Sequence, residues 1–201
     1  MERFQNNPQI DAIALVTLPN WFGFVDAYAH QFGINKLRWI VAGGETGQDS
    51  IRNGLEAIAK DCDPNTVVMI HDGNRPMVDN DIISDSLAVF EKYGSAVAVI
   101  PCTEAISKSE DGKTSTISIP REALQRTQTP HTYTLGKLLW AHEQAKRKGI
   151  LNTAASCTLM QKLGETVYFS KGSEKNFKLT TLADLEIFNA FLAVERNHWL
   201  K

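Results

Sequence analysis

Cysteine is scarce in this sequence, and the three cysteines present, Cys62, Cys102 and Cys157, stand far apart. They form no CxxC pair and no Cys/His cluster, and the five histidines show no HExxH spacing. A structural zinc site and a disulfide framework are therefore not expected. Isolated cysteines fit a reducing compartment, so we expect a cytoplasmic protein.

An excess of charge is also lacking. Lysine and arginine number 21 against 23 aspartates and glutamates, which gives a formal net charge of −2. The chain has no basic surface typical of nucleic-acid binding, so a bound anion would depend on a few local cations. Apolar runs stay shorter than the ~18 residues of a membrane helix, and the N-terminus does not resemble a signal peptide. Neither a nucleic acid nor a membrane is expected as a partner.

Apolar runs and helix-like segments alternate along most of the chain. Near-continuous apolar runs predict strands at 12–18, 37–43, 65–72 and 95–101, with a shorter strand at 166–170. Helical patterns are found at 21–32, 48–61, 80–94, 135–149 and 178–195, the last with Thr181 and Asp184 at capping-box spacing. Strands that are apolar on both faces are typical of a parallel sheet covered by helices. We predict one α/β domain over residues 1–201, with a Rossmann-like, doubly wound, mostly parallel sheet.

The alternation is interrupted at residues 102–121. Here polar and apolar residues alternate on both sides of Asp111-Gly112, a dipeptide that strongly favours a β-hairpin. Neither half is apolar enough for the central sheet. We therefore predict a β-arm that projects from the domain, either as a solvated hairpin or packed against a partner subunit.

Polar and glycine-rich residues follow three of the predicted strands. They are Gly43-Gly44-Glu45 with Ser50 on the next helix, His71-Asp72 through Arg75, and Pro101 onward. Glycine, asparagine and proline can mark simple turns. In open parallel sheets, however, ligands bind at the carboxyl ends of the strands, and the coincidence of three such features there favours a binding site.

Two later segments carry further candidates. RTQTPHTY, at 126–133, gathers hydroxyls and an imidazole around Pro130. Lys178 directly precedes a predicted helix N-terminus, where a cation gains nothing from the helix dipole. This lysine, like Arg121 at the exit of the arm, is either ordinary solvated surface or is directed at an anion.

Five motifs in order resemble one family. VAGGETGQDSIRNGL, HDGNRP, PCTEAI, RTQTPH and EKNFKLTTLADL are similar to the motifs of 2-C-methyl-D-erythritol 4-phosphate cytidylyltransferases and their relatives that act on ribitol 5-phosphate. The resemblance runs from about Phe4 to about Leu192. It implies a nucleotidyltransferase-type fold and an enzyme in which a sugar-alcohol phosphate attacks the α-phosphorus of CTP and pyrophosphate leaves.

The resemblance also implies roles for individual residues. Catalytic roles fall to Asp72, with Arg75 beside it and Lys178 facing the phosphates, and Asp72 would also contact a Mg²⁺ ion. Nucleotide contacts fall to Gly43, Gly44, Glu45 and Ser50, and substrate contacts to Arg121 and Thr129. In the family the arm reaches a second subunit, so a homodimer through residues 102–121 is expected, with Arg121 serving the partner's site.

The sequence departs from the family at several points. Gly47 stands where arginine is common, Ala105 stands where threonine is usual, and NTAASC at 152–157 replaces a more acidic segment. These positions leave the acceptor open between 2-C-methyl-D-erythritol 4-phosphate, the first expectation, and ribitol 5-phosphate.

The family's opening strand and glycine-rich, CTP-cradling loop have no counterpart in these 201 residues, whose start resembles the end of the family's first helix. As a polypeptide, residues 1–201 are therefore expected to show no appreciable CTP-dependent release of pyrophosphate. A non-catalytic remnant that acts by association is the alternative. A hydrolase using His71 and Asp72 ranks last, because no GxSxG motif is present.

Overall fold

Eight strands and seven α-helices make up residues 1–198, the part of the chain that the computed structural model describes. The strands are β1 (Ile13–Thr17), β2 (Leu37–Ala42), β3 (Val67–Ile70), β4 (Ala96–Pro101), β5 (Ile106–Lys108), β6 (Ile117–Ile119), β7 (Gln125–Thr134) and β8 (Phe169–Lys171). The α-helices are α1 (Glu2–Gln5), α2 (Phe22–Gln31), α3 (Gly47–Ile58), α4 (Asn80–Tyr93), α5 (Leu135–Lys148), α6 (Ser156–Lys162) and α7 (Leu182–His198). Two short 3₁₀ turns, η1 (Pro19–Trp21) and η2 (Arg121–Ala123), complete these elements.

The strands form three separate sheets. β1 and β2 pair in parallel, β5 and β6 pair antiparallel, and a four-stranded sheet has the order β3-β7-β4-β8. In this larger sheet β3 and β4 run antiparallel to β7, and β8 runs parallel to β4. The predicted mostly parallel α/β fold is confirmed, with β7 as an antiparallel strand inside it.

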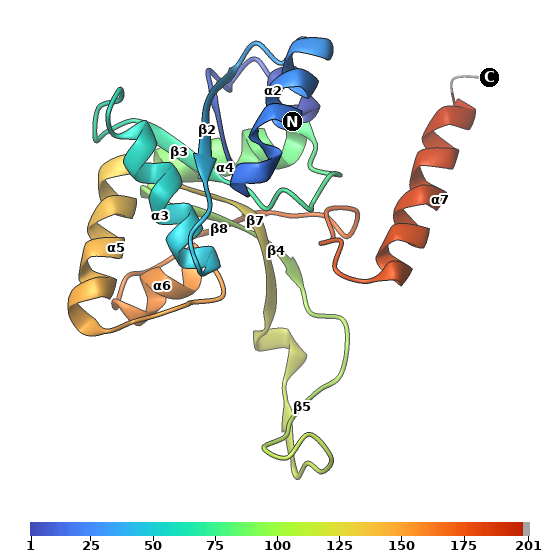
Figure 1. The fold of residues 1–201 in the computed structure, drawn as a ribbon. Coiled ribbons are helices and arrows are strands. Elements are labelled where there is room, and N and C mark those ends of the chain that lie inside the picture. Colours follow the sequence, from blue (N-terminus) through green and yellow to red (C-terminus); the bar gives the residue numbers. More distant parts are fainter. Residues whose placement is uncertain (199–201) are drawn as a thin grey trace.

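Helices cover both faces of the four-stranded sheet (Figure 1). Successive residues of β4 point to opposite faces, so that Val97 joins one buried cluster and Ala98 the other. The first cluster is completed by side chains of α3, α5 and α6, and the second by side chains of α4. This doubly wound arrangement explains why the strands carry apolar residues on both faces.

Helix α3 connects the β1–β2 pair to the rest of the domain. It packs on both of these strands and also against α5. A Cβ atom on Gly54 would lie 2.8 Å from Cγ2 of Val16, so a glycine here lets α3 approach β1 closely. Through α3, the β1–β2 pair and the loop after β2 are joined to the part of the domain that holds the four-stranded sheet.

The helix ends follow the sequence. Asp79 caps α4 by accepting a hydrogen bond from the Ile82 N–H, and Gly94 ends that helix with a left-handed φ of 78°. At α7 the Thr181 N–H donates to Asp184 (2.7 Å) while the Asp184 N–H donates to the Thr181 hydroxyl (3.2 Å). This reciprocal pair is the predicted capping box.

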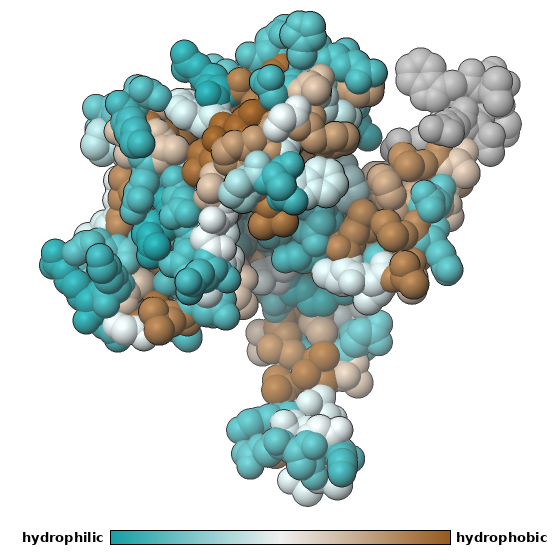
Figure 2. Space-filling model, in the orientation of Figure 1, coloured by the Kyte–Doolittle hydropathy of each residue, from teal (hydrophilic) through white to brown (hydrophobic). Residues whose placement is uncertain are grey.

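The arm and α7 both leave the body of the molecule (Figure 1). The arm is the antiparallel β5–β6 hairpin, as predicted, but eight residues, 109–116, join its strands instead of a two-residue turn. Figure 2 shows apolar surface midway along the arm, a hydrophilic arm tip, and apolar surface on α7. Among the described residues, no helix is long and apolar enough to span a membrane.

Four elements differ from the sequence-based expectation. The sequence predicts a connection from the arm to a helix at 125–134, yet this segment forms β7 inside the larger sheet. The short helices α1 and α6 were not predicted, and the strand expected at 166–170 lies slightly later, as β8. Otherwise the predicted strands and helices are present, with boundaries that differ by a few residues.

Candidate active site

The carboxylate of Asp72 lies between two cations. Asp72 follows His71, two residues after the end of β3. Its Oδ2 lies 3.0 Å from Nε of Arg75 and 3.3 Å from Nζ of Lys178. The Arg75 side chain is only 11% exposed, whereas that of Lys178 is 43% exposed. The fold thus brings Lys178 from a distant segment to Asp72, and this more accessible cation is free to reach an incoming anion.

These cations hold Asp72 in its ionised form. Burial alone would raise the pKa of its carboxyl group. The hydrogen bond from Arg75 and the charges of Lys178 and Arg75 outweigh burial, so the pKa of Asp72 lies below its ordinary value. At neutral pH the site therefore carries one fixed negative charge between two positive ones.

Reciprocal hydrogen bonds join the two loops that supply these charges. The Asn74 side-chain amide donates to the Leu179 carbonyl (2.9 Å), and the Leu179 N–H donates to the Asn74 carbonyl (2.8 Å). Nη1 of Arg75 donates to the Asn176 carbonyl (2.8 Å). The segment around Lys178 is therefore tied directly to the HDGNRP turn.

The fully buried Asn176 anchors the same segment to β7. Its side-chain amide donates to the Thr129 carbonyl (2.8 Å) and to Oε1 of Gln128 (3.3 Å). Gln128 in turn donates to the Ser173 carbonyl (2.8 Å) and accepts from the Ser173 N–H (3.1 Å). Polar side chains of β7 thus hold the Lys178 loop in place.

Thr129, a predicted substrate contact, is buried beneath Asp72. Its hydroxyl accepts a hydrogen bond from the Asp72 N–H (3.0 Å) and lies 3.1 Å from Nδ1 of His71. This hydroxyl therefore supports the backbone of the Asp72 turn.

The four predicted nucleotide contacts gather at the start of α3. The Ser50 hydroxyl accepts from the Gly44 N–H (3.0 Å) and donates to the Thr46 carbonyl (2.9 Å). A Cβ atom on Gly44 would lie 2.4 Å from Cβ of Asp49, so the loop needs a glycine to fold onto its own helix. Gly43 lies beside Ser50, and Glu45 is exposed. Across residues 1–198 no hydrogen bond or ion pair joins this group to Asp72.

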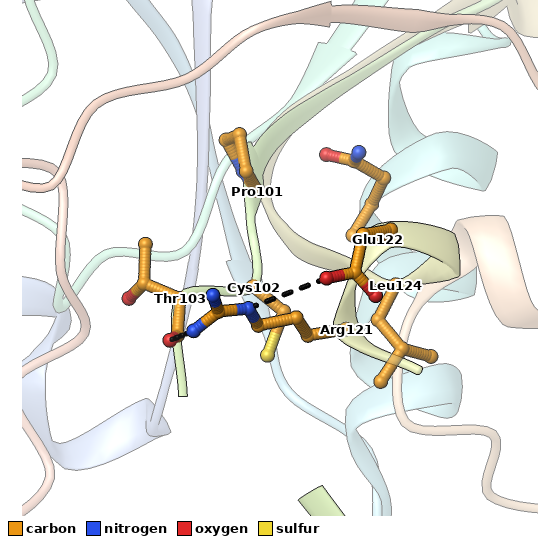
Figure 3. A pocket seen from close by; sticks show the side chains of 7 residues that line it. Pro101, Cys102, Thr103, Arg121, Glu122 and Leu124 are labelled. Atoms are coloured by element: carbon orange, nitrogen blue, oxygen red, sulfur yellow. Dashed lines mark hydrogen bonds and ion pairs between the residues drawn. The ribbon is translucent and has the colours of Figure 1, made fainter. Parts of the chain in front are cut away.

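Arg121 lies at the base of the arm and belongs to neither the Asp72 cluster nor the group at the start of α3. Its Nη1 donates to the Thr103 carbonyl (3.0 Å), and its Nε lies 3.5 Å from the Glu122 carboxylate. Figure 3 shows these contacts beside Cys102 and Leu124. The same residues line an open pocket of about 440 Å³. No hydrogen bond or ion pair in the described part of the chain links Arg121 to Asp72.

For a divalent cation at this cluster, the described residues offer one carboxylate, that of Asp72. Within residues 1–198 no group of three or more His, Cys, Asp or Glu side chains could hold a metal without other ligands. Mg²⁺ commonly uses one or two carboxylates and completes its shell with water and substrate phosphates. Asp72 is such a carboxylate, and both cations approach the same oxygen, Oδ2.

The sequence predicts no role in nucleotidyl transfer for Asn176, Gln128 or His71. Asn176 and Gln128 stood inside the motifs EKNFKLTT and RTQTPH. Their importance lies in hydrogen bonds between segments far apart in the sequence, such as Gln128 with Ser173. A motif can mark such residues, but only the fold shows what they bind.

A mostly parallel α/β fold with an Asp-Arg-Lys cluster at a strand end fits a nucleotidyltransferase-like protein. Solved structures agree. A 2-C-methyl-D-erythritol 4-phosphate cytidylyltransferase from Thermus thermophilus superposes with a TM-score of 0.68 at 32% identity, covering 78% of this chain and 73% of that one. The 4-diphosphocytidyl-2C-methyl-D-erythritol synthase of Anaerococcus prevotii, at 20% identity, shares the fold with a TM-score of 0.83 over 96% and 83% of the two chains.

The sequence comparisons identify the family. A sequence model of 2-C-methyl-D-erythritol 4-phosphate cytidylyltransferase matches residues 1–194. A ribitol-5-phosphate cytidylyltransferase of Lacticaseibacillus paracasei is 38% identical over 96% of this chain and 83% of its own length. A 2-C-methyl-D-erythritol 4-phosphate cytidylyltransferase of Clostridium acetobutylicum is 37% identical over 92% and 79%. This chain belongs to the 2-C-methyl-D-erythritol 4-phosphate cytidylyltransferase family, a family of nucleotidyltransferases.

Proposed function

We propose that the Asp72 cluster is the catalytic centre of a cytidylyltransferase that acts on CTP and a sugar-alcohol phosphate. A phosphate oxygen of the acceptor attacks the α-phosphorus of CTP, the bond from that phosphorus to the β-phosphate oxygen breaks, and pyrophosphate leaves. The observation that supports this assignment best is the convergence of Arg75 and Lys178 on one ionised carboxylate. We also propose that the reaction takes place in the cytoplasm.

The chemistry asks mainly for positioning and for neutralisation of negative charge. Lys178, exposed and only 3.3 Å from Asp72, can exchange that contact for a phosphate oxygen. Arg75 is held by Asp72 and by the Asn176 carbonyl, so it contributes a fixed positive charge. Mg²⁺ held by Asp72 and phosphate oxygens would supply further neutralisation of the triphosphate.

The remaining predicted contacts are part of the same proposal. The loop of Gly43, Gly44, Glu45 and Ser50 is proposed to bind the cytosine and ribose of CTP. Arg121 and Thr129 are proposed to act on the acceptor side, with Arg121 serving the site of a second subunit. The pocket beside Arg121, lined by residues of both ends of the arm, supports a role for this arginine in binding.

Two acceptors are proposed. The 38% identity to a ribitol-5-phosphate cytidylyltransferase supports ribitol 5-phosphate, and the 37% identity to a 2-C-methyl-D-erythritol 4-phosphate cytidylyltransferase supports the methylerythritol compound. Both acceptors present a phosphate and several hydroxyls, so side-by-side assays are needed to separate them.

Calorimetry and a pyrophosphate-release assay test the function. Each acceptor is titrated with and without CTP and Mg²⁺, and turnover is then measured with both acceptors. The 201-residue chain and a version extended ahead of Met1 by a family-type strand and glycine-rich loop are assayed together, so the result does not depend on where the chain starts. Turnover that needs CTP and one acceptor is expected in the extended version. A folded, extended protein that binds neither CTP nor either acceptor would overturn the proposal.

A further inference from the structure

The imidazole of His71 contacts one end of the turn that carries the proposed catalytic charges directly, and the other end through Thr129. Its Nε2 lies 3.0 Å from the carbonyl oxygen of Arg75. Its Nδ1 lies 3.1 Å from the hydroxyl of Thr129, and that hydroxyl is 3.0 Å from the N–H nitrogen of Asp72. One ring is therefore connected to the backbone of Asp72 on one side and to the backbone of Arg75 on the other.

The backbone partners fix the direction of two of these hydrogen bonds. A carbonyl oxygen can only accept, so Nε2 of His71 must carry the proton that it shares with Arg75. The Asp72 N–H can only donate, so the Thr129 hydroxyl accepts from it and can donate its own proton to Nδ1 of His71.

Other contacts hold this ring in its orientation. The Phe4 ring packs edge-on against His71 at a centroid distance of 5.1 Å. Thr129 lies on β7, where its carbonyl and the neighbouring Gln128 also anchor Asn176. The Arg75 N–H closes the turn by donating to the Asp72 carbonyl (3.0 Å). The Asp72 turn is therefore fixed by a chain of directed hydrogen bonds that begins on β7 and ends at Arg75.

We propose that His71 is a positioning residue for cytidylyl transfer, acting with the Thr129 hydroxyl through this chain of hydrogen bonds. With Nε2 donating to the Arg75 carbonyl and Nδ1 next to the Thr129 hydroxyl, it sets the Asp72 carboxylate and the Arg75 guanidinium at the separation that Lys178 and a bound phosphate require. The role in catalysis rests on the function proposed above, whereas the hydrogen-bond chain is a property of the free protein. His71 itself transfers no proton in the reaction.

The test uses variants matched in shape. Thr129→Val keeps the size of the side chain but removes the hydroxyl, and Thr129→Ser keeps the hydroxyl. His71→Gln offers an amide donor toward the Arg75 carbonyl, whereas His71→Ala offers none. Long-range ¹H–¹⁵N spectra report which ring nitrogen of His71 is protonated, and ¹³C spectra report the titration of the Asp72 carboxyl group. Neither measurement needs turnover.

The expected results differ between the members of each pair. Native protein and Thr129→Ser should show an unprotonated Nδ1 and an Asp72 that titrates below the ordinary carboxyl range. In Thr129→Val and His71→Ala the Asp72 titration should shift upward, toward that range. In turnover assays His71→Ala should lose on the order of 10²-fold in kcat, as for a misplaced reacting group, with a smaller change in KM. His71→Gln should recover part of this loss.

Distinct outcomes separate the two proposals. A protonated Nδ1 in the native protein, or an Asp72 titration that is the same in Thr129→Val and His71→Ala as in the native protein, overturns the positioning role. If the spectra change as expected but no form of the protein, the extended version included, uses CTP, the hydrogen-bond chain stands and the cytidylyltransferase function falls.

Discussion

Lys178 is the residue on which the proposed chemistry depends most directly. It is the exposed member of the Asp72 cluster, and its position before α7 is held by Asn176 and by the hydrogen bonds between Asn74 and Leu179. Because the loop is held by other residues, the side chain can be removed without unfolding the site.

Lys178→Ala should lower the rate of CTP-dependent pyrophosphate release by about 10²–10³-fold, the usual cost of losing one preorganised charge donor. The assay is run on the protein extended by a family-type loop. Lys175→Ala is the matched control, because Lys175 lies three residues earlier and packs over the Phe191 ring at 6.0 Å. A rate for Lys178→Ala equal to that of the control would place the phosphates elsewhere.

His142 illustrates a residue whose charge state affects stability. It lies on α5, is only 5% exposed, and neither ring nitrogen has a hydrogen-bond partner among the described residues. Burial, assisted by the charge of Arg52 and opposed by that of Asp49, lowers the pKa of His142 to about 4. Below the unfolded-state pKa of ~6.5 the unfolded chain binds a proton that the folded chain excludes, so stability falls as the pH falls from about 6.5 to about 4.

His142→Leu should therefore reduce the pH dependence of stability. The loss of unfolding free energy attributable to His142 over this window is on the order of 3 kcal/mol. Burial also lowers the pKa of His131 to about 4, so part of the pH dependence of stability remains in the variant. Urea unfolding at pH 7 and pH 4.5 measures the difference. His30→Leu on the exposed side of α2 is the control. If the free energy of unfolding falls equally between pH 7 and pH 4.5 in the native protein and in His142→Leu, His142 is hydrated or charged in the folded state.

Among the elements of the fold, β7 is the strand of the larger sheet that the sequence pattern did not predict. Its residues Gln128, Thr129, His131 and Thr132 are buried although polar, so no apolar pattern marks the strand. Several of its polar groups have partners from distant segments, such as the 2.7 Å contact between the hydroxyls of Thr132 and Ser86. Tertiary hydrogen bonding, rather than hydrophobic periodicity, makes this segment a central strand.

The other strands and the catalytic cluster were more predictable. Apolar runs predicted β1 to β4, and the rule that ligands bind at strand ends selected Asp72 and Arg75. Lys178 came from the family motif together with its position before a helix. The distances that join these residues depend on the Asn74–Leu179 and Asn176–Thr129 contacts, which link positions too far apart in sequence for local patterns to reveal.

The separation of β1–β2 from the larger sheet leads to a prediction for hydrogen exchange. Within residues 1–198, β1 pairs with β2 alone and β3 pairs with β7 alone, whereas β7 and β4 each have two neighbours. A strand with one neighbour leaves every second N–H without a partner. Amide protons of β1 and β3 should therefore alternate between fast and slow exchange, while those of His131 and Thr132 on β7, which pair with β3 on one side and β4 on the other, exchange slowly. Uniformly slow exchange along β1 and β3 in NMR measurements would mean that further polypeptide covers their edges.

The whole molecule has a shape that suits association through the arm. β5 and β6 are three residues each and pair with each other, and a lone two-stranded unit of this size is marginal in water. Asp111 organises the tip by accepting hydrogen bonds from the backbone of Lys113 and Thr114, which lowers the pKa of its carboxyl group. Ile117, on β6, is 52% exposed, and Figure 2 shows apolar surface midway along the arm.

We propose that the protein is a homodimer built through residues 102–121, and deletion of residues 104–119 tests this proposal. The deletion joins Thr103 to Pro120 and removes the strands with their isoleucines, so the apolar surface that a second subunit would cover is lost. Sedimentation velocity should then show a monomer where the native chain sediments as a dimer. Ile117→Asp should weaken the dimer with the arm still present, because a charge would be buried against an apolar surface. Lys113→Ala, at the hydrophilic tip, should leave the dimer unchanged. If the deleted chain still sediments as a dimer, the subunits associate through another surface, and Arg121 cannot be assigned to the partner's site through the arm.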